Sequence, residues 1–229
     1  MVYEAESDRI PFFKQYFSVI ILIANIIVFI WQMLDPTGNM HIEDAAFVPS
    51  EFFAGQKLWT LFTSMFMHGD IVHILMNMWF FFVITDNCEH AMGHWLYLFT
   101  YFLSGLFGSF LHALSTLIIP EWGSISMADI PSLGASGAIF GLLAVYAILY
   151  PGNKFYLPGT VGMRRVGAGY FIITYFIAEL TYAIVSIMDP FSIGQTAHFA
   201  HVGGFIAGAV IASIFKAVKG SSYKKKPKE

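Results

Sequence analysis

Four polar residues in a largely apolar chain could together carry out chemistry. Ser136 lies in the stretch SLGASGAIFG, His73 and Asn77 lie in HGDIVHILMN, and His201 lies in AHFAHVGG. A serine hydroxyl becomes a nucleophile when a base removes its proton, and an imidazole, which titrates near neutrality, can be that base. The residue types therefore indicate attack of Ser136 on a carbonyl group, with His201 as the base.

Attack on a carbonyl group produces an oxyanion, which needs hydrogen-bond donors. Ser136 opens a predicted helix, so its backbone N–H is among the donors that lack a partner within the helix. His73 and Asn77 are four residues apart and share one helix face. Their ring N–H and amide group are the natural additional donors.

Each of these residues also has a structural interpretation, which the sequence leaves open. Ser136 could be a small packing residue, and Asn77 could join two helices through a hydrogen bond. His198 is interpreted as an interfacial histidine rather than a catalytic one. Glycines at a spacing of four predict two closely packed helices, and they are Gly137, Gly141, Gly204 and Gly208. Close packing would also bring Ser136 within hydrogen-bonding reach of His201.

Other hydrolytic mechanisms fit the sequence less well. No histidine is followed by glutamate, so the H-E-x-x-H motif of zinc proteases is missing. The predicted spans contain neither a pair of mid-span aspartates nor a lysine at the depth of the serine. The order G-A-S-G differs from the G-x-S-x-G elbow of α/β-hydrolases. A serine activated by histidine is the chemistry that remains.

The composition places this chemistry in a bilayer. Hydrophobic residues make up 57% of the 229 residues, and charged residues make up 12%, whereas soluble domains carry about 25% charged residues. Cys88 is the only cysteine, so no intrachain disulfide can form. The length fits one domain.

Apolar runs predict an all-α, polytopic membrane protein with six transmembrane helices. A membrane helix needs about 20 apolar residues, and the fourth run is short and flanked by glycine. Such a helix often begins below the membrane surface, where irregular backbone lines a cavity. The predicted spans are residues 16–34, 71–88, 95–118, 136–150, 168–188 and 198–217.

The charges predict the orientation of these spans. If both termini are cytoplasmic, 11 of the 12 basic residues lie on the inner side and Lys57 alone lies outside, as the positive-inside rule requires. We therefore expect an N-terminal cytoplasmic segment (1–15), a membrane domain (16–217) and a basic cytoplasmic tail (218–229).

In this orientation the polar residues gather at a similar depth near the outer face. Polar groups in a membrane usually face the protein interior or a water-filled cavity, so their convergence predicts one wet pocket. Glu179, near the centre of the fifth span, is expected to be protonated or paired, because a buried charge is costly there.

At this point the three motifs GASGAIFG, HGDIVHILMN and AHVGG resemble the signature motifs of the rhomboid family of intramembrane serine proteases, in the same order and spacing. The resemblance implies a rhomboid-like bundle in which Ser136 is the nucleophile and His201 the general base, a dyad without an acid. His73 and Asn77 complete the oxyanion hole with the Ser136 backbone, and Gly134 belongs to the same loop.

The resemblance extends to three further residues. His68 is similar to an outer histidine that holds structure and water near the site. Glu89 is similar to a buried acid that ties helices together. Many relatives have tyrosine at the position of Phe140, stacked on the catalytic imidazole; phenylalanine keeps the stack and loses the hydroxyl.

The activity implied by the resemblance is that of an endopeptidase that cuts transmembrane helices of single-span proteins near the outer face of the cell membrane. We expect the lipid bilayer as its surroundings, with no metal, cofactor or nucleic acid. One alternative is a catalytically silent relative that binds membrane clients. Another is a metal transporter using His68, His73, His198 and His201, although these residues lie near one membrane face and not along its depth.

Overall fold

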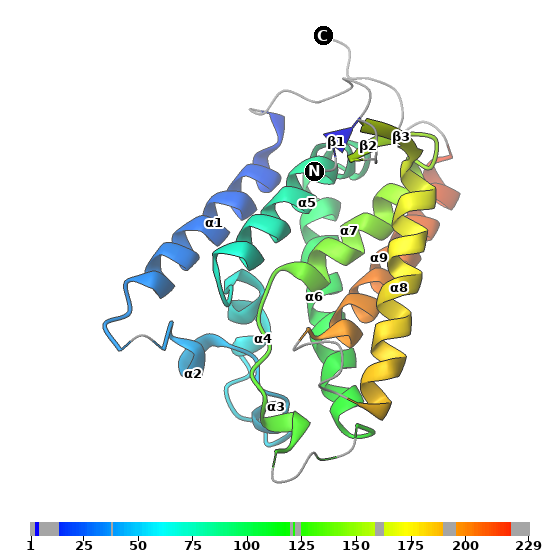
Figure 1. The fold of residues 1–229 in the computed structure, drawn as a ribbon. Helices are drawn as coiled ribbons and strands as arrows, with labels where there is room; N and C mark the ends of the chain where they lie inside the picture. Colours follow the sequence, from blue (N-terminus) through cyan, green and yellow to red (C-terminus); the bar gives the residue numbers. More distant parts are fainter. Residues whose placement is uncertain are drawn as a thin grey trace.

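The computed structural model describes residues 3–4, 14–37, 39–119, 121, 125–158, 163–189 and 196–220. The longest elements are six helices that run alternately up and down through one bundle (Figure 1). In chain order the elements are β1 (Tyr3–Glu4), α1 (Tyr16–Met33), α2 (Ile42–Ala45), α3 (Pro49–Phe53), α4 (Thr60–Thr63), η2 (Ser64–Phe66), α5 (Ile71–Met92), α6 (His94–Thr116), η3 (Met127–Asp129), α7 (Ser136–Leu149), β2 (Lys154–Pro158), β3 (Met163–Gly167), α8 (Ala168–Met188) and α9 (His198–Lys219).

Among the described helices, α1, α5, α6, α8 and α9 are long and apolar enough to cross a membrane. The sixth, α7, is apolar but has only 14 residues. All of its residues except Ser136 and Ile148 are buried, and it lies against α5, α6, α8 and α9. A helix enclosed by protein can be shorter than the bilayer is thick, because its ends need not meet lipid. The polytopic helical fold is confirmed, and the count of six spans stays a prediction.

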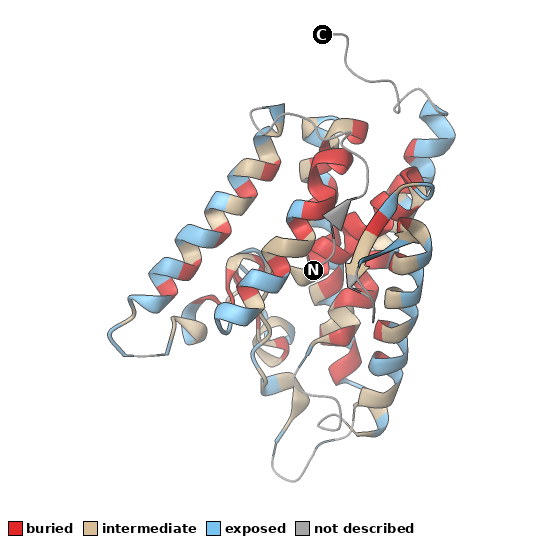
Figure 2. Cartoon of the chain, turned by 45° about the horizontal axis from the view of Figure 1, so that its top comes forward, coloured by how far each residue is buried: buried red, intermediate tan, exposed pale blue. Residues whose placement is uncertain are grey.

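Burial is concentrated at the centre of the bundle. Figure 2 shows buried residues in the middle and exposed residues on the outward faces of the outer helices. Most of the large exposed side chains on α1 and α8 are apolar, and they include Ile27, Ile30, Tyr170 and Ile177. A soluble protein rarely exposes apolar surface on this scale, so these faces fit contact with lipid.

A small antiparallel sheet is the feature that the sequence analysis did not anticipate. Its strand order is β1–β2–β3, with Tyr3 opposite Tyr156 and Lys154 opposite Gly167. It lies at the end of the bundle where α9 finishes (Figure 1). The strands have two to five residues, which is too short for a clear alternation of apolar and polar residues.

Basic residues gather at the sheet end of the bundle. The elements place Lys14, Lys154, Arg164, Arg165, Lys216 and Lys219 there, and Lys57 at the opposite end, beside α3. Arg9 and the lysines from 224 to 228 lie outside the described residues, as do most of the predicted terminal segments 1–15 and 218–229. The charge separation supports the predicted topology, and which side of the membrane each end faces stays a prediction.

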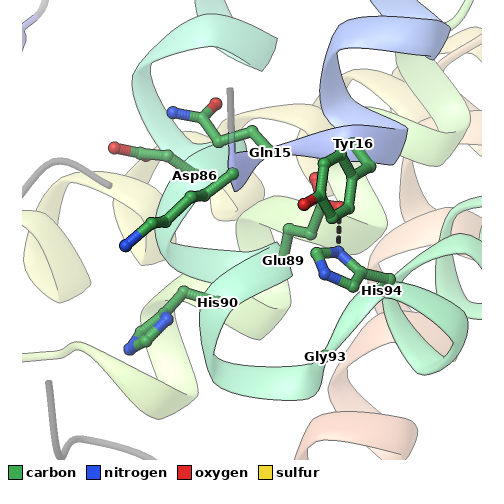
Figure 3. Close-up of a pocket in the computed structure, with 8 residues that line it drawn as sticks. Gln15, Tyr16, Asp86, Glu89, His90, Gly93 and His94 are labelled. Carbon is green, nitrogen blue, oxygen red and sulfur yellow. Dashed lines mark hydrogen bonds and ion pairs between the residues drawn. The ribbon is translucent and has the colours of Figure 1, made fainter. Parts of the chain in front are cut away.

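Glu89 joins three helices at the sheet end, as the resemblance implied. Its carboxylate accepts hydrogen bonds from the backbone N–H groups of Phe17 (2.9 Å) and Ser18 (2.8 Å) in the first turn of α1. It also lies 2.6 Å from Nδ1 of His94 at the start of α6. An acid is favourable there because the first N–H groups of a helix lack intrahelical acceptors. A cavity of about 300 Å³ lies at this end of the bundle, and Figure 3 shows Glu89 and His94 in its wall.

The start of α5 is tied to α1 by a buried amide. The Gln32 side chain accepts a hydrogen bond from the His68 backbone N–H (2.9 Å) and donates one to its carbonyl oxygen (3.2 Å). The His68 ring is fully buried and meets Phe29 edge to face at 6.4 Å. Burial lowers the pKa of His68 to about 3, and the neighbouring His73 adds to this effect.

The closest packing in the bundle is between α7 and α9, and it depends on glycine. A Cβ atom added at Gly208 would fall on the carbonyl group of Gly141, 2.6 Å from the carbonyl carbon. A Cβ atom at Gly204 would meet the backbone of Gly137 in the same way. The two backbones therefore touch, and this confirms the close packing that the glycine spacing predicted.

We expect Gly208→Ala to destabilise the fold. The added methyl group must push α9 from α7, and overpacking of this kind costs about 1–3 kcal/mol. Thermal unfolding in detergent micelles measures the effect. Gly152→Ala is the matched control, because a Cβ atom there meets nothing within 4 Å. Equal melting temperatures for the two variants would contradict the packing argument.

We expect the burial of His68 to make stability depend on pH. Its pKa in the folded state lies below the ordinary value of 6.5, so the unfolded state takes up the proton first. This contribution to stability is present above pH 6.5 and is lost as the pH falls towards 3. At pH 5 the loss is about 1–2 kcal/mol. In thermal unfolding at pH 7 and pH 5, His68→Leu should lose less stability than the wild type; parallel losses would count against this assignment.

Candidate active site

Ser136 is the first residue of α7, and its side chain faces α9. Its Oγ lies 2.8 Å from Nε2 of His201, within hydrogen-bonding distance. The glycine contact described above sets this distance, since both residues lie one turn or less before the glycines that touch. The glycine spacing predicted that the two side chains come within hydrogen-bonding reach of each other, and they do. Their catalytic roles stay a prediction.

Phe140 holds one face of the His201 ring. The two rings are stacked with centroids 4.3 Å apart and an angle of 11° between their planes. Tyr175 of α8 also packs against the Phe140 ring, with centroids 5.2 Å apart and the rings tilted by 40°. The stack that the resemblance implied for this position is therefore formed by phenylalanine, without a hydroxyl group.

His73 is arranged to donate a hydrogen bond towards the loop that precedes Ser136. Its backbone N–H is capped by Asp70 Oδ1 at 2.8 Å, and its ring Nδ1 accepts from the Gly69 backbone N–H at 3.4 Å. A neutral imidazole with an acceptor at Nδ1 carries its proton on Nε2. The His68 ring lies beside it, with centroids 5.1 Å apart.

Gly134 lets the loop approach His73 and Asn77. Its φ of +128° is strained for any residue with a side chain, and a Cβ atom there would lie 2.8 Å from Nε2 of His73 and 3.7 Å from Nδ2 of Asn77. The Gly134 backbone N–H is already bonded to the Ser64 carbonyl oxygen at 2.9 Å. A glycine is therefore needed here to leave both donors facing the backbone before Ser136.

Asn77 carries a buried donor without an acceptor. Its side chain is 8% exposed, and Nδ2 has no hydrogen-bond partner in the part of the chain that the structure describes. An unpaired buried donor costs about 1–3 kcal/mol. No side chain caps the start of α7. The backbone N–H of Ser136, as the first of this helix, has no acceptor within the helix. Together with His73, these groups can surround a negatively charged oxygen.

An acidic side chain, Glu179, is in contact with His201. It was not predicted as a residue of the site. Oε2 of Glu179, on α8, lies 2.7 Å from Nδ1 of His201 and 2.8 Å from Nδ1 of His198. The resemblance implied a dyad without an acid, whereas in this structure the Glu179 carboxylate is in contact with His201. His198 is buried within the protein, and its interpretation as an interfacial rather than a catalytic histidine stays a prediction. Glu179 is paired, which was one of the two states expected for it.

Two signals in the sequence pointed to this contact. Glu179 is the only charged residue in the 21 residues of α8, and His198 and His201 share one face of α9. What the sequence could not supply was the rotation of α8, which decides whether the acid faces α9 or lipid.

Glu179, His198 and His201 also form a group that could hold a metal ion. One ligand atom from each lies within 4.8 Å of the others. The two nitrogen-to-oxygen distances of 2.7 and 2.8 Å are those of charge-assisted hydrogen bonds, which are shorter than neutral ones. These three side chains are therefore arranged as a carboxylate that is hydrogen-bonded to two imidazoles.

Known proteins share the region that contains this site. A model of the rhomboid domain matches residues 55–217. The chain is 28% identical over 172 residues to Rhomboid-like protease 3 of Toxoplasma gondii, covering 75% of this chain and 56% of that protein. It is 30% identical over 159 residues to RHOMBOID-like protein 1 of Arabidopsis thaliana (69% and 35%). It is 24% identical over 177 residues to Rhomboid protease GluP of Bacillus subtilis (77% and 30%).

The chain spans about half the length of the first of these relatives and about a third of the other two. The family match covers well over half of this chain and includes all the residues described around Ser136. It agrees with the resemblance seen in the three motifs. This protein is a member of the rhomboid family.

Proposed function

We propose that this protein is an intramembrane serine endopeptidase that cleaves transmembrane helices of single-span membrane proteins. The observation that carries the proposal is the 2.8 Å contact between Ser136 Oγ and His201 Nε2. The unpaired Nδ2 of Asn77 lies close to Gly134, two residues before the serine. A nucleophile, a base and a free donor then lie around one point where a carbonyl group could sit. Protease-named relatives support the same activity at the level of the family.

The reaction follows from the positions of these groups. Ser136 Oγ attacks the substrate carbonyl carbon while its proton passes to His201 Nε2. The oxyanion that forms accepts hydrogen bonds from His73 Nε2, Asn77 Nδ2 and the Ser136 backbone N–H. His201 then gives its proton to the departing amine, which leaves an acyl ester on Ser136. A water molecule, deprotonated by His201, releases the acid product and restores the serine.

The proposed substrates are helices that can unwind. A membrane helix has its backbone carbonyl groups bonded internally, so a helix with glycine or another helix breaker would offer a carbonyl group most readily. Helices α5 and α7 begin at their ends away from the sheet (Figure 1), and His73 and Ser136 lie in their first turns. With the proposed topology, in which both termini are cytoplasmic, cleavage takes place near the outer face.

The proposed location is the cell membrane. The separation of basic residues between the two ends of the bundle supports the orientation. Some relatives are named as mitochondrial, among them RHOMBOID-like protein 12 of Arabidopsis thaliana. Fractionation of cells that express the tagged full chain would distinguish the two membranes.

We expect a fluorophosphonate probe to label wild-type protein in detergent micelles at Ser136 and nowhere else. Ser136→Ala should lose both labelling and cleavage of a single-span model substrate, because it removes the nucleophile. Ser132→Ala, in the same loop, is the matched control and should retain both. Peptide mapping by mass spectrometry identifies the labelled residue. Equal cleavage by wild type and Ser136→Ala would refute the mechanism, and absence of both activities in the folded wild type would favour a silent client-binding protein.

We expect Asn77→Ala to lower kcat by about 10²- to 10³-fold, which is the usual effect of removing one oxyanion-hole donor. Its melting temperature should stay close to that of the wild type, since Nδ2 has no partner to lose. Asn25→Ala is the contrast, because the Asn25 amide donates to the Ile21 carbonyl oxygen within α1. That variant should lose stability and keep the kcat of the folded enzyme. The reverse pattern would make Asn77 a structural residue.

A further inference from the structure

We propose that Glu179 is a positioning residue for the base, so that Ser136, His201 and Glu179 act together as a triad. His198 holds the acid in place as a second hydrogen-bond donor. This proposal rests on the proposed function. Glu179 does not touch the reacting atoms. It acts on them through Nδ1 of His201, which lies on the far side of the ring from Ser136.

The first consequence of the contact concerns the tautomer of His201. A carboxylate has only acceptors, so its 2.7 Å contact requires a proton on Nδ1 of His201. The neutral ring then has its lone pair on Nε2, facing Ser136 Oγ at 2.8 Å. This is the only neutral form that can take the serine proton. Without the acid, either ring nitrogen could carry the proton.

The second consequence is electrostatic. When His201 takes the serine proton it becomes a cation in a buried site, and Glu179 is 5% exposed. Charges interact more strongly in such a site than in water. The carboxylate therefore stabilises the imidazolium that forms during attack, with no rearrangement of the site.

The acid itself is held in place from α9. His198 Nδ1 lies 2.8 Å from the same Oε2 atom, and the rings of His198 and His201 are perpendicular, with centroids 6.1 Å apart. Tyr182 of α8 packs against the His198 ring at 5.3 Å. Two donors on one helix thus fix a carboxylate that comes from another, which restricts its rotamers and keeps Oε2 opposite Nδ1 of His201.

The His201 ring is constrained on three sides by these contacts. Phe140 covers one face, Ser136 faces one edge, and Glu179 faces the other. A flipped ring would present a carbon atom to at least one of the two oxygen atoms. The His201 ring is therefore fixed in one orientation. In a Ser–His pair without the acid, no acceptor would hold the Nδ1 side of the ring.

The decisive variant is Glu179→Gln, which keeps the shape of the side chain and removes its charge. We expect kcat and the rate of fluorophosphonate labelling of Ser136 to fall by about 10²-fold or more, in the range that a well-placed base contributes. KM should stay within about twofold, because Glu179 does not touch the substrate. Thr181→Val, two residues along α8, is the matched control and should match the wild type, since its hydroxyl bonds only to its own helix.

A spectroscopic measurement separates positioning from support of the fold. In protein labelled with ¹⁵N-histidine, His201 of the wild type should show a protonated Nδ1 and an unprotonated Nε2, its signals being assigned by their loss in His201→Gln. Glu179→Met, which offers no oxygen acceptor, should show a mixture of tautomers and a kcat no higher than that of Glu179→Gln. His198→Gln should reduce kcat less than either, because it loosens the acid without removing it.

Three outcomes would overturn the proposal. The first is a Glu179→Gln variant with a lower melting temperature but a wild-type kcat for its folded fraction. The second is a wild-type His201 with its proton on Nε2. The third is loss of activity with EDTA and its return with Zn²⁺, which would make Glu179, His198 and His201 metal ligands. If the wild type labels at Ser136 but cleaves no peptide bond, the proposed function fails, while the labelling rates of the variants still test the role of Glu179.

Discussion

The contact between the backbones of α7 and α9 is the constraint on which the site depends. Gly204 and Gly208 lie directly against Gly137 and Gly141, and no pair of larger residues would allow two helices to approach so closely. Helices in a membrane associate through such packing, because lipid provides no hydrophobic force between them. Ser136 and His201 lie at the start of this contact, so the same glycines that join the helices determine the 2.8 Å separation of the two side chains.

The buried polar groups around Ser136 differ in how far they are paired. The Glu179 carboxylate is bonded to Nδ1 of both His198 and His201, as a buried charge must be. Nδ2 of Asn77, in contrast, has no partner among the residues that the structure describes, and neither has Nε2 of His198. A buried donor of this kind is costly in a resting protein. The cost is understandable if an oxygen that forms during the reaction is the missing acceptor.

The sequence predicted the parts of this structure that follow from local patterns of residue types. Apolar runs located the helices, and the spacing of Gly204 and Gly208 predicted close packing. The three motifs identified Ser136 and His201. Glu179 could be noticed as a charge in an apolar helix, but its partner could not be inferred, because the contact depends on the rotation of α8 against α9. The β2–β3 hairpin was missed because strands of five residues carry too little periodicity.

The position of the acid ties the orientation of the base to the packing of a peripheral helix. The buried residues of α8 form a single stripe of Ala168, Ile172, Glu179 and Ala183. Half-buried aromatic side chains such as Tyr175 and Phe176 flank this stripe, and most of the exposed residues of α8 lie on the opposite side of the helix. Glu179 thus belongs to the narrow face by which α8 holds to the bundle. Displacement of α8 from α9 would remove the acceptor from His201 Nδ1 and leave the carboxylate in lipid, which is unfavourable. The hydrogen bonds to His198 and His201 therefore fasten α8 to α9, and the base is correctly oriented only while α8 is in place.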